Sequence, residues 1–200
     1  MIEIKSISFA RSGHQIYKDF SAQLEIGEAV LLTGVNGAGK STLIQLIGGL
    51  LIPQQGSIEI DGVALSQLNT KEQARLRSIA PQRRTFTLAF TVAEVLHFLP
   101  KPFRVADNSK IIERLGLSDL LQKKVTELSI GQQERVSLAL ALSQKAKYYL
   151  LDEPFSAQDS ESTSRILEII SELKRENGVL VISHNQDAIT KYFDRVISLA

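Results

Sequence analysis

A glycine-rich turn, Gly34-Val35-Asn36-Gly37-Ala38-Gly39-Lys40-Ser41-Thr42, joins the apolar run Ala29 to Thr33 to a segment of helical character that reaches Ile47. The apolar run is typical of a strand buried on both faces. Glycines let backbone N–H groups turn toward a phosphate, and the start of the helix adds its partial positive charge. A plain glycine-rich turn would not need the lysine and serine. In the P-loop pattern, Lys40 reaches the β- and γ-phosphates and Ser41 ligates Mg²⁺.

An acidic pair follows a second predicted buried strand, the apolar run Tyr148 to Leu151. This run places Asp152 at the carboxyl end of a strand, which is the edge that carries ligands in open α/β sheets. Asp152 therefore suits the role of holding Mg²⁺. Glu153 points elsewhere and is a candidate to orient and deprotonate an attacking water. The alternative, a polar loop start at Asp152-Glu153-Pro154, is disfavoured by the P-loop in the same chain.

Strand and helix patterns alternate along the rest of the chain. Further strands are predicted from the apolar positions Ile2, Ile4, Ile7 and Phe9, from Ala22, Leu24 and Ile26, from Ile58 and Ile60 before an Asp61-Gly62 hairpin turn, and at Val179 to Ile182 and Val196 to Leu199. Residues 86–145 are predicted to be mostly helical, with Ser109 capping a short helix that stops at Gly116. The helical spacing of Ile166, Ile169, Ile170 and Leu173 predicts another helix, which Asn177-Gly178 is expected to close. This alternation predicts a parallel α/β sheet.

The run Leu128-Ser129-Ile130-Gly131-Gln132-Gln133-Glu134-Arg135-Val136 precedes the acidic pair and opens an amphipathic helix predicted over about 131–146. A serine hydroxyl, a glycine N–H and a helix N-terminus together form an anion site. We assign Ser129, Gly131 and Gln132 to this site, although alone they could be an ordinary N-cap. A chain that already has a P-loop does not need a second set of anion donors for its own phosphate.

Taken together, these segments resemble the ABC ATPases over almost the whole chain, because the Ser129 run matches the signature motif of that family. The resemblance implies that the signature of one subunit caps the γ-phosphate bound by another, so that two ATP molecules lie in a head-to-tail pair. It also implies that Gln82 belongs to the Q-loop, which senses Mg²⁺ and the attacking water. Ser156-Ala157-Gln158-Asp159 matches the D-loop, and His184 matches the switch histidine that contacts the γ-phosphate.

The implied fold is an α/β P-loop NTPase (RecA-like) with a parallel sheet core, an antiparallel β subdomain and an inserted α-helical subdomain. We expect a single domain over 1–200, with the core at about 1–85 and 146–200 and the helical subdomain at about 86–145. The implied function is ATP hydrolysis, with ATP and Mg²⁺, that drives an integral membrane permease from the cytoplasmic face of the cell membrane. The expected partners are a second ATPase subunit, permease subunits and, as a further candidate, a solute-binding protein.

Three positions depart from the common family pattern. Ile130 stands where a second glycine is usual, and it is stiffer and bulkier. Gln158 stands in the D-loop where an apolar residue is common. Arg11 occupies the position of the usual adenine-stacking aromatic residue, and a guanidinium can stack on a base. We therefore assign Arg11 to the nucleotide site; Phe9 or Tyr17 could substitute for it, although Tyr17 is expected in the core.

A group of apolar residues follows Gln82, and it predicts either a subdomain core or a docking patch. The group comprises Phe86, Leu88, Phe90, Val92, Val95, Leu96, Phe98 and Leu99. In ABC transporters this region receives a coupling helix of the membrane subunit, so both readings can hold for different residues.

Composition narrows the alternatives. The formal net charge of +1 gives no electrostatic footprint for nucleic acid, and the pairs Arg83-Arg84 and Lys123-Lys124 are expected to be solvated. There is no cysteine and therefore no disulfide or thiol chemistry. No apolar run approaches the roughly 18 residues of a membrane span. A kinase would leave the signature run unexplained. Soluble ABC ATPases of chromosome maintenance or translation remain the alternative function, without the expected coiled coil or second cassette.

Overall fold

The computed structural model describes residues 1–82, 84–184 and 189–199. Within these residues, five parallel strands form the central sheet in the order β6-β7-β8-β3-β9. Their bounds are β3 Ala29–Gly34, β6 Arg77–Ala80, β7 Tyr148–Asp152, β8 Gly178–Ile182 and β9 Arg195–Leu199. Every residue of β7 and β8 is buried, as expected for parallel strands covered on both faces.

A second, antiparallel sheet has the order β2-β1-β4-β5. Its strands are β1 Ile2–Arg11, β2 His14–Leu24, β4 Gln55–Ile60 and β5 Val63–Ala64. Ile60 pairs with Val63, and Asp61 and Gly62 between them both have positive φ, at 53° and 79°. This geometry confirms the predicted hairpin turn. β2 ends before Ile26, which is 47% exposed, because the chain turns at Gly27 with φ 92°.

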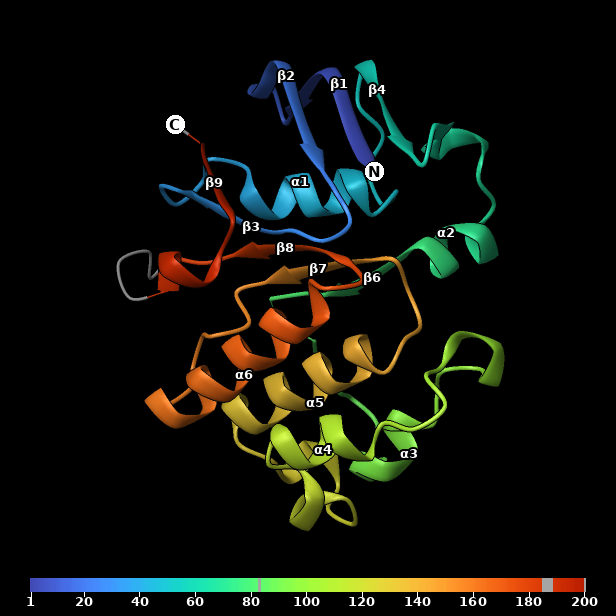
Figure 1. Cartoon of the computed structure of the whole chain (residues 1–200), viewed down its shortest axis with the longest axis vertical. Helices are drawn as coiled ribbons and strands as arrows, with labels where there is room; N and C mark the ends of the chain where they lie inside the picture. Colours follow the sequence, from blue (N-terminus) through green and yellow to red (C-terminus); the bar gives the residue numbers. More distant parts are fainter. Residues whose placement is uncertain (83, 185–188, 200) are drawn as a thin grey trace.

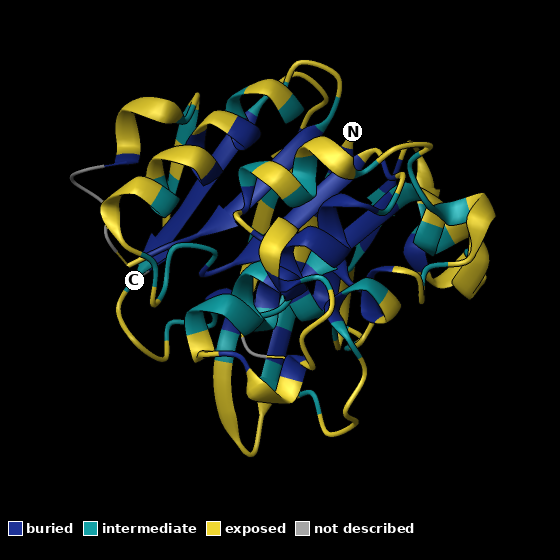
Figure 2. Ribbon diagram, turned by 90° about the horizontal axis from the view of Figure 1, so that it is seen from below, coloured by how far each residue is buried: buried dark blue, intermediate teal, exposed yellow. Residues whose placement is uncertain are grey.

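Helices cover the two faces of the parallel sheet unequally (Figure 1). α1, Lys40–Ile47, lies between the parallel sheet and the antiparallel sheet, and α2, Thr70–Leu76, lies beside them. On the opposite face lie α3 Val92–Leu96, α4 Ser109–Arg114, α5 Ile130–Leu142 and α6 Ser160–Leu173. Seen from that face, these helices are exposed outward while the strands behind them are buried (Figure 2).

The buried apolar side chains of the described residues form two clusters, one on each face of the parallel sheet. The helical-side cluster joins the sheet to α3, α5 and α6 and includes Leu31, Leu151 and Val181. The α1-side cluster joins the sheet to α1 and the antiparallel sheet and includes Leu32, Leu150 and Ile182. Adjacent strand residues therefore enter opposite clusters, as the period of two requires.

Several helix predictions need correction. α5 ends at Leu142 rather than near 146, because the Gln144 side chain donates to the carbonyls of Ala74 and Arg77 and its backbone leaves the helix. α6 ends at Leu173, so Asn177-Gly178 does not close it and Gly178 instead begins β8. A Cβ at Gly178 would lie 2.5 Å from the Glu25 carbonyl oxygen, which explains the glycine.

The region 86–145 contains more loop than predicted. Among its described elements α3 and α4 are short, and a turn of 3-10 helix at Lys101–Phe103 lies between them. Two more such turns, at Ser118–Leu120 and Val125–Glu127, lie between α4 and α5. Ser109 does not cap α4; it is the first helical residue, and its N–H and hydroxyl donate to the Asp107 carboxylate. The chain does turn at Gly116, whose φ is 62°, as predicted.

The predicted basic pairs are exposed where the structure describes them. Arg84, Lys123 and Lys124 are exposed, and Arg83 lies outside the described residues. None of the helices in residues 1–82, 84–184 and 189–199 is long and apolar enough to cross a membrane.

Candidate nucleotide-binding site

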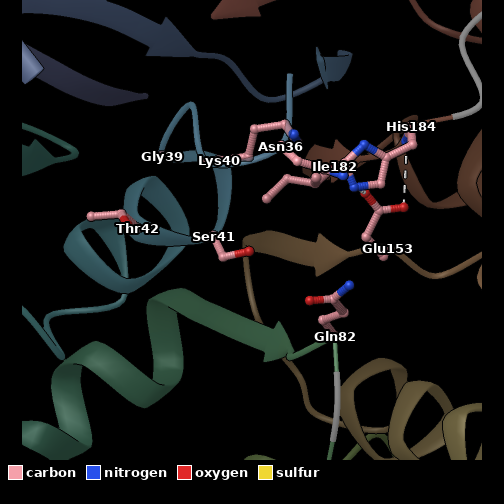
Figure 3. Close-up of a pocket in the computed structure, with 10 residues that line it drawn as sticks. Asn36, Gly39, Lys40, Ser41, Thr42, Gln82, Glu153, Ile182 and His184 are labelled. Carbon is pink, nitrogen blue, oxygen red and sulfur yellow. Dashed lines mark hydrogen bonds and ion pairs between the residues drawn. The ribbon is translucent and has the colours of Figure 1, made fainter. Parts of the chain in front are cut away.

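A cavity of about 260 Å³ lies between the start of α1 and the carboxyl ends of β7 and β8 (Figure 3). Its lining residues are Asn36, Gly37, Gly39, Lys40, Ser41, Thr42, Gln82, Glu153, Ile182 and His184. This is the sheet edge at which ligands bind in open α/β folds. The structure therefore brings together residues from four separate parts of the sequence. Residue patterns pointed to the turn before α1 and to Glu153, and the family resemblance pointed to Gln82 and His184.

The loop before α1 has the backbone that a phosphate cradle needs. Gly37 and Gly39 have positive φ, at 89° and 96°, so both lie in the region that favours glycine. Lys40 is buried, with 6% of its surface exposed, and its Nζ donates to the carbonyl oxygens of Gly34 at 2.7 Å and Val35 at 2.9 Å. The ammonium thus lies across the loop. Gly34 and Ala38 belong to this loop but do not line the cavity.

Tyr17 on β2 contacts the loop before α1, and the sequence patterns did not indicate this contact. As predicted, Tyr17 is buried in the core, and Phe9 is buried beside it in the α1-side cluster. The Tyr17 hydroxyl also donates to the Gly39 carbonyl oxygen at 2.8 Å. A Cβ at Gly39 would lie 2.4 Å from Ile16 Cγ2, so only glycine fits. No local pattern could show this contact, because β2 and the loop meet only in the folded chain.

Asp152 ends β7 beside Ser41, with 7% of its surface exposed. Burial raises the pKa of the Asp152 carboxyl, while the hydrogen bond with the Ser41 hydroxyl and the charges of Lys40 and His184 oppose this rise. Its Oδ1 is buried and has no hydrogen-bond partner among the described residues. A buried carboxylate oxygen without a partner is costly unless a ligand or a metal ion satisfies it.

Glu153 and His184 line the same part of the cavity and contact each other (Figure 3). His184 Nε2 lies 2.9 Å from Glu153 Oε1, and the His184 backbone N–H donates to Glu153 Oε2 at 3.4 Å. Burial raises the pKa of the Glu153 carboxyl to about 7, and the Asp152 charge adds to this rise, whereas the His184 N–H and Lys40 oppose it. A carboxyl with this pKa can accept a proton from water near neutral pH.

Four of the predicted site residues lie away from this cavity. Ser129, Gly131 and Gln132 open α5, and Arg11 ends β1; none of them lines the cavity. Ser129 is an N-cap: its Oγ accepts from the Gln132 N–H at 3.3 Å, and Gln132 Oε1 accepts from the Ser129 N–H at 3.0 Å. The Arg11 side chain is exposed and forms no hydrogen bond or ion pair with the described residues.

Comparison with known proteins identifies the family. A family model described as ABC transporter matches residues 17–156. The hemin import ATP-binding protein HmuV of Bordetella avium is 34% identical over 215 residues, which cover 100% of this chain and 82% of that protein. The methionine import ATP-binding protein MetN of Caulobacter vibrioides is 35% identical over 212 residues, which cover 100% of this chain and 64% of that protein.

A solved structure agrees with these sequence matches. A dimeric bacterial ABC transporter cassette superposes with a TM-score of 0.85 and 26% sequence identity, over 100% of this chain and 94% of that one. The chain belongs to the ABC transporter family and is the ATP-binding and ATP-hydrolysing subunit of such a transporter. The predicted family, the P-loop NTPase fold and the ATPase activity are thereby confirmed.

Proposed function

We propose that two copies of this chain close on two ATP molecules and that the resulting cycle of hydrolysis drives an integral membrane permease. The cavity lined by Lys40, Ser41 and the Glu153–His184 pair, with the Asp152 carboxyl beside Ser41, carries this proposal. Binding drives closure because ATP has a higher affinity for the closed dimer than for the open chains. Hydrolysis and product release remove that difference and let the dimer open.

Within the cavity, the N–H groups from Gly34 to Thr42 and the Lys40 ammonium bind the β- and γ-phosphates. Mg²⁺ fits the donor set beside them: the Ser41 hydroxyl, the unpaired Asp152 Oδ1 and the Gln82 amide. When bound, Mg²⁺ would neutralise charge on the phosphate oxygens. The described residues contain no group of three His, Asp or Glu side chains that could hold a metal ion, and a Mg²⁺ shared with substrate phosphates does not require one.

Glu153 acts as the general base in this proposal, and His184 contacts the γ-phosphate. Their 2.9 Å separation would keep the carboxylate oriented toward the water that attacks phosphorus. Gln82 lines the same cavity and would contact both the water and the metal ion. Arg11 would cover the adenine; the exposure of its side chain leaves the guanidinium able to stack, and Arg11→Ala should then weaken ATP binding.

In this proposal, the Ser129–Gly131 turn of one copy contacts the ATP that is bound by the second copy. A thirteen-residue helix, α5, begins at the turn that contains Ser129, Gly131 and Gln132. This helix start could bind an anion, but it does not line the cavity of its own chain. The dimeric state of the structural relative supports the same assembly. A head-to-tail pair would place this helix start, with its partial positive charge, against the γ-phosphate held by the other copy.

The permease would dock on the exposed part of the apolar group that follows Gln82. Leu88, Phe90 and Phe98 are 64%, 36% and 55% exposed, whereas Val92, Val95 and Leu96 are buried in the helical-side cluster. Docking there would hold the chain at the cytoplasmic face of the cell membrane. HmuV and MetN are both named import proteins, which supports import and a solute-binding protein as a further partner. Their cargoes differ at nearly equal identity, so we assign none.

Purification from native membranes in ATP tests the assembly. Tagged Glu153→Gln protein should stall as an ATP-bound dimer and carry a stoichiometric polytopic membrane protein, whose identity would narrow the cargo. The matched control is Glu153→Gln combined with Lys40→Ala, which removes the phosphate-binding ammonium and should yield no ATP-dependent dimer. A soluble partner, or an ATP-dependent dimer without a membrane protein, would contradict coupling to a permease.

A further inference from the structure

The first turn of α5 and the loop after Glu153 touch backbone to backbone. A Cβ added at Gly131 would lie 2.5 Å from the Ala157 carbonyl oxygen and 3.7 Å from Gln158 Nε2. No side chain fits in that space, so the glycine of the signature is needed inside its own chain as well as for any phosphate. The contact joins the Ser129–Gly131 turn to residues that begin three positions after Glu153.

The Gln158 side chain closes this contact with hydrogen bonds. Its Nε2 lies 3.2 Å from the Gly131 carbonyl oxygen, 3.1 Å from that of Ser156 and 3.4 Å from Glu134 Oε2. Ser156 Oγ donates to the other carboxylate oxygen of Glu134 at 3.1 Å. One glutamine amide therefore connects the carbonyl of the signature glycine to the loop, and the Glu134 carboxylate connects the same two segments a second time.

The loop needs such fastening because its backbone is strained. Glu153 and Ala157 have φ of 54° and 52°, in the left-handed region that costs a non-glycine residue about 1 kcal/mol or more. Strained conformations persist when surrounding contacts fix them. Gln158 and Glu134 provide such contacts on the side of the loop that faces α5.

We infer that Gln158 is a positioning residue that fastens the Ser129–Gly131 turn to the loop after Glu153, so that the two segments of one chain move as a single body. Its consequence for ATP-dependent closure rests on the proposed function, in which the Ser129–Gly131 turn caps a phosphate held by a second copy. An apolar residue at position 158 could fill the space but could not donate to the Gly131 carbonyl.

The test replaces Gln158 with leucine, which removes the amide donors at similar size. In the nucleotide-free protein, hydrogen exchange should quicken about tenfold in peptides covering 128–136 and 154–160, because both segments lose their common hydrogen bonds. ATP binding at the P-loop should be unchanged, while ATP-dependent dimerisation of the Glu153→Gln form should weaken about tenfold. Gly131→Ala should quicken exchange in the same two peptides, because its Cβ forces the segments apart.

The matched control is Gln67→Leu, which makes the same change at an exposed glutamine remote from the contact. It should leave exchange and dimerisation at wild-type values. If Gln158→Leu leaves the hydrogen-exchange rates of both peptides unchanged, Gln158 does not hold the two segments together. If exchange becomes faster but ATP-dependent dimerisation is unchanged, Gln158 is not a positioning residue for dimerisation. If the Glu153→Gln protein with native Gln158 does not dimerise in ATP, the proposed function fails, and the exchange measurement still decides whether Gln158 fastens the two segments.

Discussion

At the scale of single residues, the conformation of Glu153 separates two adjacent carboxylates. Asp152 ends β7 beside Ser41, whereas Glu153, with φ of 54°, turns toward His184. The Glu153 backbone N–H donates to the Ile182 carbonyl oxygen at 3.0 Å, which holds the turn against β8. One carboxylate can therefore face a metal ion while its neighbour faces a water, although they are consecutive in the sequence.

The raised pKa of Glu153 predicts how hydrolysis depends on pH. A general base must be ionised, and burial raises the pKa of this carboxyl to about 7, so the base is protonated below that pH. We expect kcat/KM to rise through pH 7 and to level off above it, as measured by phosphate release at saturating Mg²⁺.

Glu153→Gln provides the control for this pH profile. It should lower turnover by about 10²- to 10⁴-fold, and its residual rate should lack the rise through pH 7. A wild-type rate that stays constant from pH 6 to 8 would contradict the role of Glu153 as the base.

At the scale of elements, the P-loop helix α1 is stabilised from both ends by residues remote in sequence. The carbonyl of its N-cap residue, Gly39, accepts the Tyr17 hydroxyl. At its C-terminus, the buried Arg77 guanidinium donates to the carbonyl oxygens of Ile47 at 3.0 Å and of Gly48, and also to Gln73 Oε1 at 2.6 Å. A cation at this end also interacts favourably with the helix dipole.

Removal of Arg77 should therefore destabilise the chain. Arg77→Met leaves buried carbonyl groups without donors, and we expect a loss of about 2 to 3 kcal/mol in the free energy of unfolding. Urea unfolding followed by circular dichroism measures this loss. Lys71→Met, which removes an exposed cation on α2, should change stability by less than about 0.5 kcal/mol. Equal effects of the two substitutions would show that the α1 cap is not important.

Sequence patterns predicted elements whose signals are local and failed where distant contacts decide. Lys40 to Ile47 and the Asp61-Gly62 hairpin matched their predicted bounds, because glycine positions and apolar spacing specify them. The ends of α5 and α6 were wrong by about four residues, because Gln144 bonds to α2 and β6 and Gly178 packs against Glu25 and Tyr148. Within the site, residue patterns indicated Lys40, Asp152 and Glu153, and the family resemblance indicated His184, but nothing in the sequence indicated the contact of Tyr17 with the Gly39 carbonyl.

At the scale of the whole molecule, the apolar residues after Gln82 divide between core and surface. Sequence alone left both readings open, because an apolar residue in a loop-rich region looks the same in either place. Phe90 and Phe98 contact each other edge to face with centroids 4.9 Å apart, and Leu88 adds to the exposed group. Exposed large apolar side chains gathered in one region are typical of an interaction surface.

Charged substitutions on this surface should separate hydrolysis from transport. Leu88→Asp with Phe98→Asp should leave the ATPase activity of the isolated chain within about twofold, because neither residue lines the nucleotide cavity. Transport by the assembled complex in vesicles should fall at least about tenfold, because a buried carboxylate at an apolar interface is costly. Val63→Asp, at an exposed valine of β5, is the control and should transport normally. Normal docking and transport by the double variant would rule out this surface.

The alternation of strand residues between the two clusters limits which parts of this cassette can be exchanged with those of a related cassette. Leu31 and Leu151 belong to the helical-side cluster, while their neighbours Leu32 and Leu150 belong to the α1-side cluster. A helical segment exchanged between related cassettes would meet only every second residue of these strands. Helices transplanted onto the sheet of another cassette must therefore fit the strand side chains that point toward them, and they do not contact the alternate side chains on the other face. The unit that can be exchanged is thus one face of the sheet with its helices, not a continuous stretch of sequence.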